Sequence, residues 1–311
     1  MTRPTPAAER GSPVAARLAH PLLWMHVAII LFSTLALVTF LAGTPPAFMQ
    51  TPLAAKVYPI GFKFSGPTYV VLGALAALAH AAGKFGWRRA LGLLAVGVLL
   101  SLGAELTGTS TGLPFGDYSY TEMLGYRIAG LVPYPIPLSW FFMIYCCLAI
   151  CGRLLPAHDS ADTRMRWALV AGLVLVAWDV SMDPAMSYAT AHWRWHQPGF
   201  FYGMPFLNWV GWYLTGTLVA RAMLAIVPPS GFAGQVSPTT FPLILYAVNG
   251  VMPVALVARR EMWWAFVPGL LAMAIPVALA IRAGIRAGRV AHQARTPHAR
   301  SAPVPASVTG D

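Results

Sequence analysis

The 311-residue chain has little charge. Only 10% of its residues are Asp, Glu, Lys or Arg, whereas soluble domains carry about 25%. Hydrophobic residues reach 57%, and the mean hydropathy is +0.62. A soluble fold of this length could not bury so much apolar surface. The composition therefore excludes secreted, disordered and nucleic-acid-binding proteins, and it predicts an integral membrane protein.

Lysine and cysteine are also scarce. There are three lysines, none of them inside a predicted span, which excludes a retinal Schiff base. The net charge of +11 comes mostly from arginines in the tails and short connections. That distribution is typical of membrane topology and of contacts with membrane lipids, not of a DNA groove. The three cysteines, Cys146, Cys147 and Cys151, lie in one apolar run without a C-x-x-C pair, and we expect small core residues.

Long apolar stretches predict an all-α, polytopic transmembrane bundle. We count eight spans; seven remain open because only Arg259, Arg260 and Glu261 separate the last two. With an even count and cytoplasmic termini, fifteen of the 21 lysines and arginines lie on the cytoplasmic side. We therefore predict a multi-pass cell-membrane protein with both termini in the cytoplasm. The predicted spans are 21–43, 68–83, 87–106, 135–152, 166–183, 206–227, 240–258 and 262–281.

The domain organisation follows from the same pattern. Residues 21–283 form one predicted transmembrane domain, with no internal repeat and no soluble domain. Residues 1–20 and 284–311 are rich in Ala, Pro, Arg, Ser and Thr, which is typical of disordered segments. We therefore predict a disordered cytoplasmic tail at each end, the second of them basic.

Acidic residues number only ten, and five gather on the predicted outer side. Ionisable groups inside a membrane are costly and often functional. Asp179 and Asp183 are four residues apart, which places them on one helical face. Other interpretations remain open: Asp183 before Pro184 could cap a helix, Glu105 could be an ordinary interfacial carboxylate, and the two loop acids could be solvated. The five are Glu105, Asp117, Glu122, Asp179 and Asp183.

Two connecting segments on this side, 107–121 and 192–203, mix glycine and proline with aromatic residues. Irregular backbone at membrane depth is tolerated where it is buried in protein or lines a cavity. We therefore predict two irregular or re-entrant segments beside a cavity with aromatic walls. His192 and His196 have the i, i+4 spacing of metal ligands, but their tryptophan neighbours fit an interfacial aromatic belt equally well. We predict no metal site.

Carboxyl groups in an aromatic, water-poor pocket favour one chemistry that needs no cofactor. A buried carboxyl group that keeps its proton can donate it to a carbon–carbon double bond. Aromatic faces stabilise the resulting carbocation, and a second carboxylate can orient the water that attacks it. Composition alone does not separate this chemistry from a transporter.

Three ordered blocks carry a family resemblance. The first runs from TGLPFGDYSYT (111–121) through Leu124-Gly125 to IPLSWFFM (136–143). The others are AWDVSMDPAM (177–186) and YGMPFLNWVGW (202–212). They resemble membrane carotenoid-biosynthesis proteins of the carotenoid 1,2-hydratase and bisanhydrobacterioruberin hydratase type. The resemblance implies a bacterial lyase-class hydratase without a cofactor, which adds water to a terminal ψ-end double bond of a carotenoid. It also implies a lipid-soluble substrate and other carotenoid enzymes as partners.

Within these blocks, we assign the chemistry to acidic residues. Asp179 or Glu105 would protonate C2 of the terminal isoprene unit, which forms a cation at C1. Asp183 or Asp117 would orient the water. Aromatic and amide side chains would bind the substrate, with the amide also bonding water or product. These predicted substrate-binding residues are Trp178, Tyr118, Tyr120, Tyr202, Asn208 and Trp140.

Three other functions stay open on the sequence. A carotenoid end-group cyclase begins with the same protonation, but a neighbouring double bond traps the cation. A membrane prenyltransferase could hold magnesium and diphosphate on the D-x-x-x-D of 179–183, although no second Asp-rich motif is present. A lipid or small-molecule transporter could use buried carboxyl groups for proton coupling, although no inverted repeat is evident.

Overall fold

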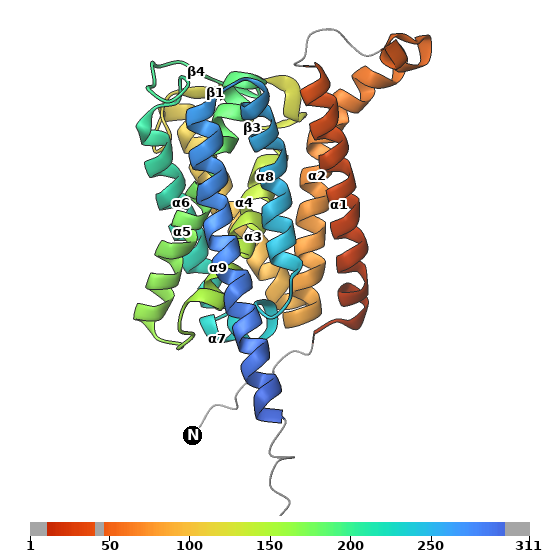
Figure 1. Cartoon of the computed structure of the whole chain (residues 1–311). Coiled ribbons are helices and arrows are strands. Elements are labelled where there is room, and N and C mark those ends of the chain that lie inside the picture. Colours follow the sequence, from red (N-terminus) through yellow and green to blue (C-terminus); the bar gives the residue numbers. More distant parts are fainter. Residues whose placement is uncertain (1–10, 41–46, 296–311) are drawn as a thin grey trace, which may run out of the picture.

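The computed structural model describes residues 11–40 and 47–295. Within these ranges, eight helices are long and apolar enough to cross a membrane, and they form one bundle (Figure 1). The eight-span, all-α prediction is confirmed, and the seven-span alternative is wrong. The helices are α1 (Pro13–Phe40), α2 (Pro52–Phe85), α3 (Trp87–Thr111), α4 (Pro135–Leu154), α5 (Ala161–Pro184), α6 (Phe206–Ile226), α8 (Phe241–Arg259) and α9 (Trp263–Arg295).

Several helices extend past the predicted spans. α1 begins at Pro13 instead of residue 21, and α9 continues to Arg295. The added stretches contain alanine and arginine, which are good helix formers, and extending an existing helix needs no new nucleation. The prediction of disordered tails is therefore wrong for residues 13–20 and 284–295. Residues 11–12 precede the helix, and the rest of both predicted tails, 1–10 and 296–311, lies outside the described residues.

Helix α4 lies at the centre of the bundle. It packs against α2, α3, α5, α6, α8 and α9, and every residue from Trp140 to Cys151 is buried. Cys146, Cys147 and Cys151 are all buried and free, as expected for small core residues. Helices α2 and α3 reverse around a single residue, Gly86, whose φ of 81° suits glycine far better than any other residue.

Short elements gather at both ends of the bundle. Between α3 and α4 lie β1 (Tyr118–Tyr120), η2 (Glu122–Leu124), β2 (Arg127–Ile128) and β3 (Val132–Pro133). The α5–α6 connection contains η3 (Ala185–Ala189) and β4 (Trp193–Trp195) at the same end (Figure 1). At the opposite end, α7 (Pro229–Gly231) and η4 (Phe232–Val236) join α6 to α8. The short η1 (Ala47–Gln50) precedes α2, at the end of the bundle where β1 and β4 lie.

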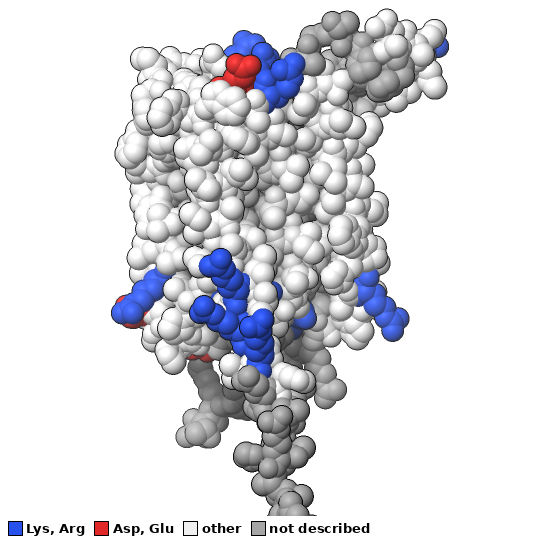
Figure 2. Space-filling model, in the orientation of Figure 1, with Lys and Arg blue, Asp and Glu red and all other residues white. Residues whose placement is uncertain are grey.

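The surface charge separates the two ends of the bundle. On the face in Figure 2, a broad band without charged side chains lies between two charged rims. Lys and Arg are more numerous at the rim where α9 ends, which is also where α1 begins. This asymmetry follows the pattern of the positive-inside rule.

Candidate active site

The two segments expected to be irregular pair with each other as a small antiparallel ribbon. Strand β1 pairs with β4, with Tyr118 opposite Trp195 and Tyr120 opposite Trp193. Side chains alternate along a strand, so these four aromatic rings face inward while the central residue of each strand is exposed. We call this β1–β4 ribbon the aromatic lid, because all four rings line one cavity beneath it.

The Glu105 carboxyl group, near the end of α3, accepts three hydrogen bonds. Its Oε2 accepts from the hydroxyl of Tyr118 at 2.5 Å and from that of Tyr120 at 2.8 Å. Its Oε1 accepts from Nε1 of Trp140 on α4 at 3.0 Å. Glu105 is only 3% exposed, so these donors replace the water that an ionised carboxylate would otherwise need.

The two tyrosines of the lid keep their protons. Burial, together with the nearby Glu105 charge, raises the pKa of both Tyr118 and Tyr120 well above the usual value of 10. Both hydroxyl groups therefore remain donors throughout the physiological pH range. Because they come from β1, the lid supplies two of the three hydrogen bonds to Glu105.

A second buried carboxyl site lies on α5. Asn208 of α6 donates from Nδ2 to Asp183 Oδ2 at 2.7 Å and to Asp179 Oδ2 at 3.2 Å. Asp183 Oδ1 also accepts from Nε1 of Trp193 in the lid at 3.2 Å and from the Ser187 hydroxyl at 3.2 Å. Asp179 Oδ1 is buried and has no hydrogen-bond partner among the described residues. The two carboxyl groups thus share one amide donor but differ in their surroundings.

Asp183 does not cap a helix. Helix α5 continues through Pro184 and then widens into the π-helical turn η3. Proline has no N–H for the helical hydrogen bond to the preceding turn, and π turns of this kind often occur at functional sites. The alternative interpretation of Asp183 as an N-cap is therefore wrong, and its side chain is free to face the cavity.

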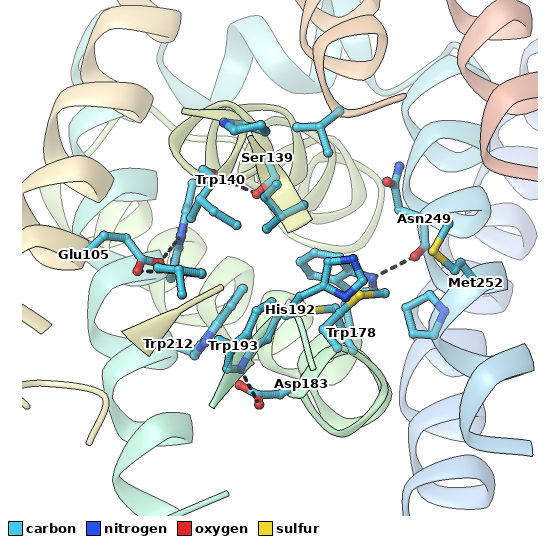
Figure 3. A pocket seen from close by; sticks show the side chains of 18 of the residues that line it. Glu105, Ser139, Trp140, Trp178, Asp183, His192, Trp193, Trp212, Asn249 and Met252 are labelled. Carbon is cyan, nitrogen blue, oxygen red and sulfur yellow. Dashed lines mark hydrogen bonds between the residues drawn. The ribbon is translucent and has the colours of Figure 1, made fainter. Parts of the chain in front are cut away.

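The cavity between these two sites measures about 860 Å³, counted out to its mouth. Its lining is mostly apolar and includes Glu105 and Asp183, which lie on different sides of it (Figure 3). The rings of Trp140 and Trp212 stack at 4.3 Å, and Trp178 meets Trp212 edge-on at 5.8 Å. Binding pockets are typically apolar and lined by a few well-placed polar groups, so this one has the lining of a small-molecule site.

Hydrogen bonds fix the opposite wall. Trp178 donates from Nε1 to the Asn249 carbonyl at 2.9 Å (Figure 3). The Asn249 amide contacts Nε2 of His26 at 3.1 Å, and Nδ1 of His26 lies 2.7 Å from the Tyr69 carbonyl. Because a carbonyl can only accept, the His26 proton is assigned to Nδ1. This series of hydrogen bonds connects α5, α8, α1 and α2, and it holds the Trp178 ring in place.

Most predicted site residues meet in this cavity, but three do not line it. Asp179 is fully buried behind Asn208. Asp117 is exposed, and only its backbone takes part in the lid, where its carbonyl accepts from the His196 N–H at 2.9 Å. Tyr202 packs on Tyr188 and accepts from the Trp264 N–H, outside the cavity. The predicted residues that line it are Glu105, Asp183, Tyr118, Tyr120, Trp140, Trp178 and Asn208.

The sequence analysis missed several lining residues. Trp193 and Trp195 face the cavity because β4 is a strand, and their i, i+2 spacing around Arg194 could have indicated this. Trp212 and Asn249 gave no signal that separates a cavity wall from an ordinary helix contact. The i, i+4 spacing of His192 and His196 does not place them on one helical face, because 193–195 is a strand. Among the described residues, no group of three His, Cys, Asp or Glu side chains could hold a metal ion.

Comparison with known proteins gives the family. Bisanhydrobacterioruberin hydratase of Haloarcula japonica is 30% identical over 189 residues, which cover 61% of this chain and 60% of that protein. The chain thus matches less than two thirds of that relative's length. No solved structure matches the chain. The profile of the family described as carotenoid biosynthesis protein matches residues 65–276, which include every lining residue named above, and the chain belongs to this family.

Proposed function

We propose that the protein hydrates a terminal ψ-end double bond of a carotenoid to give a tertiary alcohol. The observation that carries this proposal is an apolar cavity walled by indole and phenol rings, with buried carboxyl groups on two sides. The hydratase name of the relative supports the same reaction class. The substrate reaches such a site from the lipid, and other membrane enzymes of carotenoid synthesis would supply it or take up the product.

The proton comes from the Asp179–Asp183 pair. Two carboxylates that share one amide in a dry interior would repel each other, so the pair retains a proton. Asp183 faces the cavity and Asp179 does not. Asp183 therefore delivers the proton to C2 of the terminal isoprene unit, and Asp179 shares the proton before transfer. This exchanges the roles expected from the sequence for the two aspartates.

Glu105 stabilises the charge that protonation creates. When the O–H bond of Asp183 breaks and a C–H bond forms at C2, the π electrons leave a cation at C1. The Glu105 carboxylate, held by its three donors, lies across the cavity from Asp183. The faces of Trp140, Trp178 and Trp212 supply cation–π stabilisation between them. Water then adds to C1 and releases a proton, so one water is consumed for each double bond.

The cavity lies in the outer half of the membrane in this proposal. The described chain begins and ends at the more basic rim, which we assign to the cytoplasm. The lid is at the other rim. Arg259 and Arg260 also lie there, in the α8–α9 turn, where Arg260 reaches the carbonyl of Ala189 at 3.5 Å. Reactivity toward an impermeant thiol reagent in intact cells tests this orientation: Ser119→Cys should react, and Ser160→Cys, at the opposite rim, should not.

Expression in a lycopene-producing host followed by pigment mass analysis tests the function. Hydration adds the mass of one water at each modified end. A product of unchanged mass with a ring would instead assign the cavity to a cyclase. Unchanged lycopene in cells that contain the inserted protein would contradict both reactions for this substrate. A second acyclic carotenoid, tested in parallel, checks whether end-group chemistry or chain length decides acceptance.

A further inference from the structure

A second hollow adjoins the cavity and differs from it in character. It measures about 330 Å³, counted out to its mouth, and lies between α1, α2, η2 and α8. Two serine hydroxyl groups and one imidazole border it, whereas indole rings dominate the main cavity. Tyr69, His192 and Met252 border both spaces, so the two are neighbours across these side chains. The hollow is lined chiefly by Ser33, Leu37, Ser65, Tyr69, His192 and Met252.

We propose that this hollow is the water site of the hydratase and that Nε2 of His192 accepts the proton released when water adds to the cation. The inference rests on the proposed hydration, and it identifies where water, the second substrate, enters the site. About 20 Å³ of the hollow is open to the centre of a water molecule, and about 10–15 Å³ is enough for one, so the hollow has room for a water molecule. Its serine oxygens and the histidine provide the polar partners that ordered water requires.

The backbone on both sides of His192 is held in place. Its N–H donates to the Met186 carbonyl at 2.7 Å, and its carbonyl accepts from the Thr121 N–H at 3.0 Å. The first bond ties His192 to η3, and the second ties it to the end of β1. His192 is 8% exposed, and its ring points into the cavity beside Trp178 (Figure 3). The ring is therefore a fixed part of the wall between the two spaces.

The neighbouring hydroxyl group determines which ring nitrogen carries the proton. Thr190 Oγ1 lies 3.0 Å from the Ala185 carbonyl and 3.2 Å from that of Met186, so its hydrogen goes to one of these acceptors. The Thr190 oxygen then accepts from Nδ1 of His192 at 2.6 Å. The proton is assigned to Nδ1, which leaves the lone pair on Nε2 without a partner among the described residues.

The charge state of the ring agrees with this role. Burial lowers the pKa of His192 to about 4, so the imidazole is neutral near pH 7 and can accept a proton. The water adduct of a tertiary cation is a far stronger acid than an imidazolium, so a weakly basic nitrogen is sufficient. The new C–O bond takes an electron pair from water, and an O–H bond breaks toward Nε2. Asp183 has lost one proton and His192 has gained one. Transfer of a proton from His192 back to Asp183 through water restores both groups for the next turnover.

The carboxyl groups are less suited to this step. Both oxygens of Glu105 and both oxygens of Asp183 already accept hydrogen bonds from protein donors. Asp183 also gives up the proton in the preceding step. Ser139, another polar lining residue, donates its hydroxyl to the Ile136 carbonyl at 2.7 Å and has no basic atom. With Asp183 as the acid and His192 as the base, neither group has to perform both steps within one turnover.

The test separates protonation from water addition. Membranes with the full-length protein are incubated with lycopene in D₂O, and both alcohol and recovered lycopene are analysed by mass. Protonation that is reversed without water addition places deuterium on carbon in the recovered lycopene. For His192→Phe we expect alcohol formation to fall by about 100-fold, as for removal of a general base, while deuterium still enters recovered lycopene. His196→Phe, on the exposed side of the ribbon beside Ser119, is the matched control and should stay within about twofold of wild type.

Two further variants keep the result interpretable. His192→Gln retains a hydrogen-bond acceptor but no base, and it should recover packing while alcohol formation stays low. Ser33→Leu fills the hollow from α1 and should give the same pattern of retained deuterium uptake and reduced alcohol. Wild-type alcohol formation in His192→Phe would overturn the inference, as would joint loss of alcohol and deuterium uptake in His192→Gln. Absence of alcohol from the wild-type protein would overturn the proposed function itself, which is a distinct result.

Discussion

The two carboxyl sites of the cavity are built differently. Glu105 is a single carboxyl group with three donors, drawn from β1 and α4. Asp179 and Asp183 are two carboxyl groups that share the amide of Asn208, and one of their oxygens has no partner among the described residues. A surplus of donors stabilises a fixed negative charge, whereas a shortage favours a retained proton. The proposed function assigns an anion to one side of the cavity and an acid to the other.

Replacing the acid should have the largest effect. Asp183→Asn removes the proton donor but keeps a side chain of the same size beside Asn208. We expect hydration to fall by about 1,000-fold or more, within the range for general acids, and deuterium uptake into lycopene to disappear with it. Pigment mass analysis, normalised to inserted protein, measures both. Asp117→Asn, exposed at the edge of the lid, should leave hydration unchanged; equal losses in the two variants would contradict the assignment.

Neutralising the anion should rank next. Glu105→Gln removes the charge opposite the developing cation, and we expect about a 100-fold loss of hydration, comparable to removal of one preorganised electrostatic contact. The product should remain the same alcohol, because the water site is untouched. If Glu105→Gln abolished deuterium uptake completely while Asp183→Asn retained it, the roles of the two sites would have to be exchanged.

Asp179 should matter less than its partner. It is buried behind Asn208 and does not line the cavity, so Asp179→Asn leaves a donor in reach of substrate. We expect about a tenfold loss of hydration, because Asp183 then lacks the neighbouring carboxyl group that helps it to retain its proton. Asp179→Ala, which leaves a small void, distinguishes packing from proton sharing. A loss as large as that of Asp183→Asn would show that the pair acts as one indivisible acid.

The smallest effect should come from single donors to Glu105. Tyr120→Phe removes one of three hydrogen bonds and leaves the ring in the lid, so we expect about a fivefold loss of hydration. Tyr118→Phe should behave similarly, and the double variant should lose more than the product of the two, because a single remaining donor leaves Glu105 poorly held. Tyr188→Phe, exposed on η3, is the control for ring substitutions near the lid.

Sequence reasoning succeeded where one physical property dominated. Apolar length determined the eight helices. The cost of burying carboxyl groups drew attention to five acids, of which Glu105, Asp179 and Asp183 are buried and the other two, Asp117 and Glu122, are exposed. It failed where distant segments meet. Nothing in 118–120 or 193–195 alone reveals that these strands pair, so Trp193 and Trp195 were missed and Tyr202 was included. Asp179 and Asp183 share a helical face, yet only the position of Asn208 on α6 decides which of them reaches the cavity.

The pairing of β1 with β4 has one further consequence. A shift of one residue along either strand would turn Ser119 or Arg194 inward and withdraw the rings on that side, because neighbouring side chains point to opposite faces. Tyr118, which donates to Glu105, and Trp193, which donates to Asp183, both belong to the β1–β4 ribbon. An insertion within either strand would therefore disturb the hydrogen bonds to Glu105 and to Asp183 at once. We expect the two loops to tolerate insertions only outside 118–120 and 193–195.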